Sequence, residues 1–411
     1  MKHLFPWILA ALLVSALRLG TPVARIMTDG AEYLHLAEQG FSPGAHLGAP
    51  FAYRIAVPML VRAASALTGA APAAVFPVVV LIAGFGVLLA GCALAGREGA
   101  SPRNAAFVML LLAASLFAVR FPLYCPFDVD IEACLVSCAA FACVRRGSMG
   151  AAIAVSLGGL LFKEFLLAPL AAITIVFLLR YAQERSVRPL QSATLTVVLT
   201  LAVFLIPRLL IPVTSSFGTI IEYRLPSPSR TLYFSQLRMF LAWPPRPATA
   251  VNILLALLSF WLPALMLWTR SRGGAVLRAA GGNRILFLVW LAAVVGLMTV
   301  GGTKIMVFAV YTLPFLAATL GVILETGPHP AEVLFVLAAT ALFNRIVFPL
   351  GSPGGDPGVD IGFYGAYGLE ITDATLRRLA EAAGWVGAAV LMRLWLRRKR
   401  EAEAPAAGTI V

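Results

Sequence analysis

Long apolar runs separated by short polar segments dominate the pattern of the chain. The runs are continuous and about 15 to 22 residues long, the length that crosses a bilayer as an α-helix. Their polarity does not alternate from one residue to the next, as it would in membrane-spanning strands. The pattern therefore predicts an all-α polytopic membrane protein with about twelve transmembrane helices and short interfacial helices in its first outer loop.

The first predicted span covers residues 4–19; Lys2 precedes it on the cytoplasmic side, and we expect an uncleaved signal-anchor helix. The other spans are expected at residues 74–94, 105–119, a fourth run that ends at Arg145 and Arg146, 151–162, 165–179, 193–213, 248–268, 285–300, 305–324, 331–350 and a twelfth run that ends at Arg397 and Arg400. Residues 55–67 are apolar but too short to span, and they contain Pro58 and Arg62. This segment is predicted to be a helix lying at the outer interface.

These spans form one integral membrane domain, residues 1–400, followed by a cytoplasmic tail, residues 401–411, that we expect to be disordered. Polar segments at residues 21–72, 214–247 and 351–375 are expected on the outer side. Basic residues in the short inner connections favour this orientation, with both termini in the cytoplasm. A bacterial inner membrane is the expected location.

Composition supports the membrane assignment and excludes two other classes. The chain is 60% hydrophobic and only 12% charged, with a mean hydropathy of +0.89, whereas about a quarter of a soluble protein is charged. The net charge of +13 comes from clusters at the ends of apolar runs, which is typical of topology signals and not of a nucleic-acid surface. Four of the five cysteines lie inside apolar runs, so we expect no disulfide framework.

The first outer segment contains the densest set of titratable groups. Asp29 and Glu32 are one helical turn apart if Asp29 caps a short helix that ends at Gly40. One interpretation is a capped surface helix. The other is a catalytic pair, a general base or a metal-binding carboxylate placed directly outside the first span.

A second acidic cluster follows the third span, where Asp128 and Asp130 are two residues apart. In an extended loop, this spacing suits a divalent cation that bridges to phosphate oxygens. Acidic residues also simply solvate the entrance of a helix, so the motif alone leaves both interpretations open.

Lys163 and Glu164 separate two short apolar helices on the outer side. Charges at membrane depth are costly and usually belong to a pathway, a partner or a site. Lys163 could hold a phosphate that arrives laterally from the lipid, with Glu164 in support. The alternative is a short outer loop that only needed polar residues.

Several cations are predicted on the same outer face. Each could extend to the interface without further function, but together they favour a cavity that receives an anion. They are Arg54, Arg208, Lys304 and Arg345.

With these residues in view, the chain resembles the GT-C superfamily of polytopic membrane glycosyltransferases. The resemblance rests on an acidic first outer loop, TDGAEYLHLAEQG, a following segment PFAYRIAVP similar to a bacterial PF-x-YR-x-x-x-P motif, and the Lys-Glu segment GLLFKEFLLAP. It covers about residues 1–180. The first loop departs from the family pattern, because it has Asp-Gly-Ala-Glu instead of adjacent acids.

The resemblance implies an inverting transfer of a sugar from a polyprenyl-phosphate-linked donor to a glycan, lipid or protein acceptor on the periplasmic side. Asp29 would act as the base or assist a metal, and a divalent cation, Mg²⁺ or Mn²⁺, is the only cofactor expected. Arg54, Lys163, Lys304 and Arg345 would hold the donor phosphate. Two other classes stay open: a transporter or flippase of an anionic lipid or solute, and a non-catalytic membrane assembly factor.

Overall fold

The computed structural model describes residues 4–21, 28–42, 45–217, 222–229, 247–268, 274, 284–300, 305–346, 371 and 373–403. A helix lies at every predicted span: α1 (Phe5–Leu19), α4 (Pro72–Arg97), α5 (Pro102–Ala113), α7 (Asp130–Arg145), α8 (Met149–Gly159), α9 (Leu167–Glu184), α10 (Val187–Leu210), α12 (Pro247–Met266), α14 (Arg284–Val300), α16 (Leu313–Glu325), α17 (Pro330–Phe343) and α19 (Asp373–Glu403). The polytopic helical fold is therefore confirmed.

The number of membrane-spanning helices is harder to establish from the structure than from the sequence pattern. Within the described residues, five helices are long and apolar enough to cross a membrane alone: α4, α9 with the short turn before it, α10, α12 and α19. A sixth span is possible if α5 and the following residues 118–124, which are bent by 70°, count together. The remaining apolar helices are shorter, so the total of twelve stays a prediction.

Two predicted spans are interrupted in the structure. The run at residues 105–119 is broken between α5 and α6 (Phe121–Tyr124) by a π-helical turn, η2 (Leu116–Arg120). The run at residues 305–324 consists of α15 (Ile305–Phe308), the 3-10 turn η6 (Ala309–Thr312) and α16. Both breaks were missed for the same reason. An apolar run indicates that a segment is buried, but it does not indicate where the helical hydrogen bonds change register.

Two helices of the first outer segment pack together, α2 (Thr28–Gln39) and α3 (Ala56–Thr68). Asp29 lies in the first turn of α2 and not at its N-cap, because the helix begins one residue earlier. Gly40 ends α2 as predicted, with a positive φ of 62°. Nη1 of Arg62, on α3, donates to the carbonyls of Ala37 and Glu38. A side chain of α3 thus supplies hydrogen bonds to backbone carbonyls at the C-terminal end of α2.

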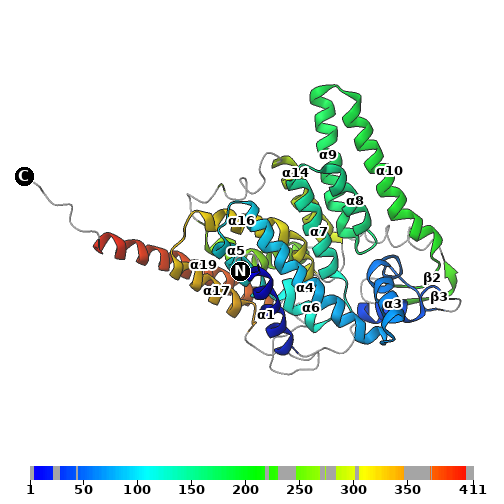
Figure 1. Cartoon of the computed structure of the whole chain (residues 1–411), viewed down its shortest axis with the longest axis horizontal. Helices are drawn as coiled ribbons and strands as arrows, with labels where there is room; N and C mark the ends of the chain where they lie inside the picture. The colour runs from blue at the N-terminus through cyan, green and yellow to red at the C-terminus, as the bar shows by residue number, and fades with distance from the viewer. Residues whose placement is uncertain are drawn as a thin grey trace, which may run out of the picture.

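A small sheet departs from the all-α prediction. Its strands are β1 (Gly48–Ala49), β2 (Val213–Phe217) and β3 (Glu222–Ser229), in the order β1–β2–β3. β1 and β2 are parallel, with Gly48 opposite Ser215, and β2 and β3 are antiparallel. The sheet joins the first outer segment to the segment after α10, where the sequence predicted the end of a span and a loop. Figure 1 shows β2 and β3 beside α3.

The main core lies where α4 meets α5, α7 and α16. α4 and α16 approach closely because Gly321 has no side chain: a Cβ there would lie 2.8 Å from the backbone of Ala95.

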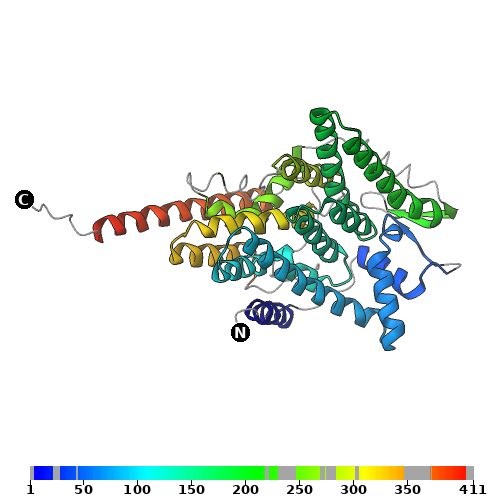
Figure 2. The same cartoon turned by 45° about the horizontal axis from the view of Figure 1, so that its top comes forward.

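In Figures 1 and 2, the end of α19 and the small sheet lie at opposite ends of the long axis. α19 continues to Glu403, into the segment from residue 401 that was expected to be a disordered tail, and residues 404–411 lie outside the described residues.

Candidate functional site

Lys163 occupies the break between α8 and α9, on extended backbone. Its side chain is buried, and Nζ lies 2.7 Å from the carboxylate of Asp130 at the start of α7. Tyr311, in η6, donates its hydroxyl to the same carboxylate at 2.8 Å. Asp130 therefore has two donors from two other parts of the chain.

The start of α7 explains the position of the two aspartates. Asp130 is the first residue of the helix, where a carboxylate is favoured by the helix dipole. Asp128 turns back, and its Oδ1 accepts a hydrogen bond from the backbone N–H of Val129 at 2.9 Å. The loop is thus a helix entrance and not the extended D-x-D arrangement that the metal hypothesis required.

Glu164 forms a second group of charges next to Lys163. Its Oε2 accepts from Nε of Arg54 at 2.9 Å and its Oε1 accepts from Nη2 of Arg208 at 3.0 Å. Arg208 is 3% exposed and lies against the rings of Phe204 and Tyr53. One carboxylate thus joins the first outer segment to the end of α10.

Tyr33 connects this group to helix α2. Nη1 of Arg54 donates to the Tyr33 hydroxyl oxygen at 2.8 Å. Burial raises the pKa of Tyr33 well above its usual value against the opposing effect of Arg54, so the phenol stays neutral. Burial lowers the pKa of Arg54, but Glu164 and Tyr33 outweigh that effect and raise it well above its usual value. The guanidinium therefore stays charged.

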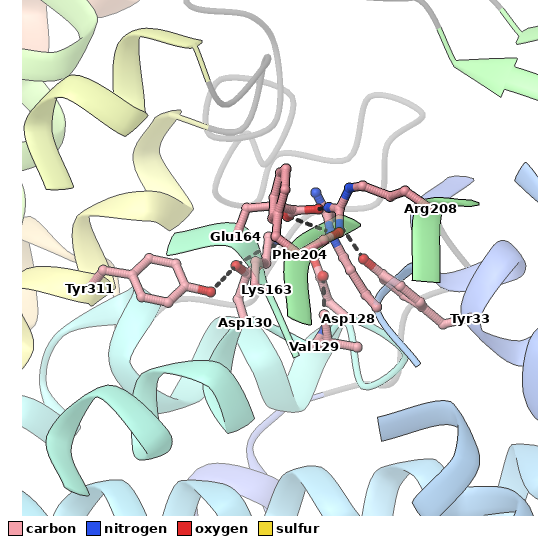
Figure 3. Close-up of polar contacts among 10 residues, drawn as sticks. Tyr33, Asp128, Val129, Asp130, Lys163, Glu164, Phe204, Arg208 and Tyr311 are labelled. Atoms are coloured by element: carbon pink, nitrogen blue, oxygen red, sulfur yellow. Dashed lines mark hydrogen bonds and ion pairs between the residues drawn. The ribbon is translucent and has the colours of Figure 1, made fainter. Parts of the chain in front are cut away.

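The residues described so far make one cluster, which we call the charge cluster: Arg54, Asp130, Lys163, Glu164 and Arg208. In Figure 3, Tyr311 approaches Asp130 from one side, whereas Arg208 and Tyr33 lie on the other side of the cluster. The five side chains of the cluster carry a formal charge of +1, and the carboxylates of Asp29 and Asp128 lie nearby. The ammonium and guanidinium groups of the cluster are donors that suit an anionic group with several oxygen atoms.

Asp29 and Asp128 lie close to this cluster. Both carboxylates are near enough to Tyr33 for their charges to act on its pKa. Asp29 is half-buried in the first turn of α2, one turn before Tyr33 on the same face. The structure therefore brings together the predicted groups Asp29, Asp128, Asp130, Lys163 and Glu164.

Glu32 has a different environment from Asp29. Its Oε1 lies 3.1 Å from Nε2 of His46, which in turn lies 3.3 Å from Oγ of Ser215 in β2. These contacts tie α2 to the small sheet. Glu32 is thus placed to hold the outer segments together, whereas Asp29 lies near Tyr33.

Arg345 lies in another group of charges. It makes two contacts with Glu381 of α19, at 2.7 and 2.9 Å, and Arg378 also donates to Glu381. The structure therefore does not bring Arg345 into contact with the charge cluster. Lys304, the other predicted phosphate ligand of the second half, lies outside the described residues.

The divalent cation expected at Asp128 and Asp130 stays a prediction, and both carboxylates have donors from the protein. Asp130 accepts from Lys163 and Tyr311, and Asp128 accepts from the backbone of Val129. Among the residues that the structure describes, no group of three or more His, Cys, Asp or Glu side chains is arranged to hold a metal ion.

Three residues of the site were not identified as site residues from the sequence. Arg208 was one outer cation among several, although a charge inside an apolar run is a recognised signal. Tyr33 could have been found from its position one turn after Asp29. Tyr311 lies in an apolar run and gives no such signal.

Comparison with known proteins supports the fold. No family model and no curated protein sequence matches the chain. Among solved structures, the chain is similar to the crystal structure of ArnT from Cupriavidus metallidurans bound to undecaprenyl phosphate, with a TM-score of 0.54 and 16% sequence identity. The alignment covers 93% of this chain and 76% of ArnT. The chain thus has the polytopic membrane fold of ArnT, which agrees with the helical membrane fold expected from the sequence.

Proposed function

We propose that the protein is a membrane glycosyltransferase that moves a sugar from a polyprenyl-phosphate-linked donor to an acceptor on the outer side of the membrane. The observation that carries the proposal is the charge cluster, three cations held around two carboxylates in an ArnT-like fold. ArnT was crystallised with undecaprenyl phosphate, which has the chemistry that such a cluster would bind. Buried charge at the end of membrane helices also matches a ligand that arrives from the lipid.

The cations would act on the phosphate of the donor. Lys163, Arg54 and Arg208 can share its oxygens because their present partners, Asp130 and Glu164, are themselves oxygen acceptors. As the bond between the sugar and the phosphate breaks, negative charge grows on the leaving phosphate. Cations already held in place stabilise that charge without reorganising.

Asp29 is the residue that we assign as proton acceptor. The acceptor hydroxyl attacks the anomeric carbon as the bond to the phosphate breaks, its proton passes to the Asp29 carboxylate, and polyprenyl phosphate leaves. One displacement from the opposite side inverts the anomeric centre. Asp29 suits this role because it is half-buried, on the face of α2 that carries Tyr33.

The test uses purified full-length protein in lipid nanodiscs with a panel of undecaprenyl-phosphate-linked hexoses and pentoses. Release of undecaprenyl phosphate is measured by mass spectrometry and the product anomer by NMR. Asp29→Asn is expected to lower turnover by about 10²–10⁴-fold, the range for a lost general base. The matched control is Glu38→Gln, an exposed acid on the same helix, which should keep wild-type turnover.

Two outcomes would reject parts of this proposal. Wild-type turnover in Asp29→Asn would remove Asp29 from the mechanism. The transporter or flippase function would be favoured if a fluorescently labelled undecaprenyl-phosphate lipid moved between leaflets while no sugar was released from any donor in the panel. Buried charge supports that class as well.

A further inference from the structure

A pocket of about 400 Å³ lies between α9 and α14, away from the charge cluster. Its polar residues are Arg180, Gln183 and Arg284, and its apolar residues are Val176, Leu179, Ile285 and Leu286. The charge cluster adjoins the start of α9, whereas Arg180 and Gln183 lie in its last turns. The helix has 18 residues, a length of about 27 Å, so the pocket is at the opposite end of the membrane domain.

The two arginines of the pocket have no protein partner within the described part of the chain. Neither guanidinium forms an ion pair or a hydrogen bond there, although α9 and α14 pack side by side. Glu184, the last residue of α9, lies four residues after Arg180, but it forms no ion pair with either guanidinium group in the part of the chain that the structure describes.

The apolar part of the pocket distinguishes a lipid from a free anion. Leu179 is 39% exposed and Ile285 is 51% exposed, and both extend the apolar surface of membrane helices below the arginines. A free phosphate would use only the guanidinium groups. A phospholipid would use both parts, with its headgroup at the arginines and an acyl chain along the leucine and isoleucine side chains.

We propose that this pocket binds one anionic phospholipid, with Arg180 and Arg284 holding its phosphate. The inference does not depend on the proposed glycosyl transfer, because the pocket shares no residue with the charge cluster. A lipid seated here would hold α9 against α14 at the face opposite to the charge cluster.

The test releases full-length protein from nanodiscs of equal phosphatidylglycerol and phosphatidylcholine and counts retained lipids by native mass spectrometry. Wild-type protein is expected to retain phosphatidylglycerol in preference to phosphatidylcholine. Arg180→Gln with Arg284→Gln should lower this retention by about 30-fold, the combined effect of two basic residues near anionic lipid. Arg188→Gln, which removes one positive charge outside the pocket at the start of α10, should leave it unchanged.

Arg180→Lys with Arg284→Lys keeps the charge and should keep most of the retention, which separates loss of binding from loss of folding. A photoactivatable phosphatidylglycerol provides a measurement on the unaltered protein, and its cross-links should map to residues 176–183 or 284–286. Cross-links elsewhere, or equal losses in Arg188→Gln and in the double Gln variant, would overturn the proposal. Thermal stabilisation by inorganic phosphate that needs both arginines, without phosphatidylglycerol retention, would assign the pocket to a free anion instead.

Discussion

Two groups of ion pairs in the molecule use similar residues in different ways. In the charge cluster, the side chains of Lys163 and Asp130 are each 3% exposed, and the partners come from distant parts of the chain. In the second group, Arg345 and Glu381 are 35% and 25% exposed, and they join the neighbouring helices α17 and α19. Burial makes the first group costly to keep and the second group inexpensive. The proposed ligand-binding role of the first group would account for its cost, whereas the second group joins α17 to α19.

The largest effect should follow from removing the buried cation. Lys163→Met leaves the Asp130 carboxylate buried with Tyr311 as its remaining donor among the contacts described above, so we expect a loss of about 3–5 kcal/mol in the free energy of unfolding. Asp130→Asn in the same chain should restore part of this loss, because no charge is then left unpaired. Unfolding in mixed detergent micelles measures both. A loss under about 1 kcal/mol would place Lys163 among surface charges.

Tyr311→Phe should have the next largest effect. It removes the hydroxyl that donates to Asp130 and keeps the ring that stacks on Phe165 with centroids 4.4 Å apart. A hydrogen bond to a charged group is worth about 1.5–3 kcal/mol, and we expect a loss of stability in that range. Phe308, which lies against Lys163 in the same region, gives a control: Phe308→Leu keeps every polar contact of Asp130. If the two variants lose the same stability, packing and not the hydrogen bond accounts for the result.

Arg208→Gln tests whether the cluster holds a phosphate. Glu164 keeps Arg54 as a partner, so folding should be largely unaffected. The KM for the lipid-linked donor should rise about ten-fold, as expected for one lost charge-assisted contact, while kcat falls less. Arg188→Gln, at the other end of the same helix, should change neither constant. An unchanged KM in Arg208→Gln would separate this residue from donor binding.

The smallest effect is expected in the second group. Glu381→Gln removes the carboxylate shared by Arg345 and Arg378, and partly exposed pairs of this kind contribute at most about 1 kcal/mol. Turnover should stay within about two-fold of wild type. A large loss of turnover would indicate that Arg345 contributes to the donor site. The two groups would then not differ in function.

The sequence predicted most of the helices, because apolar runs of spanning length have few other uses. It also singled out Asp29, Asp130, Lys163 and Glu164, since charges in an apolar chain are costly and usually belong to a partner or a site. It did not predict which partners they have. The contact between Glu164 and Arg208 depends on how α9 and α10 pack, and no local pattern records that geometry.

The breaks and the strands were missed for related reasons. A change of hydrogen-bond register inside an apolar run, as at Ala309–Thr312, leaves no mark on the hydrophobic pattern. β1 and β2 pair residues such as Gly48 and Ser215, which are far apart in sequence, and β1 is only two residues long. Strand signals need longer alternating runs to be detected.

The small sheet also has a mechanical consequence for the two arginines on Glu164. Arg54 follows β1 by five residues and Arg208 precedes β2 by five residues. Leu47 and Thr214 exchange hydrogen bonds at 2.8 and 2.9 Å, so the two segments cannot slide past each other without breaking the parallel pairing. The pairing therefore couples the position of the end of α10 to that of the first outer segment, and these two parts carry the two arginines.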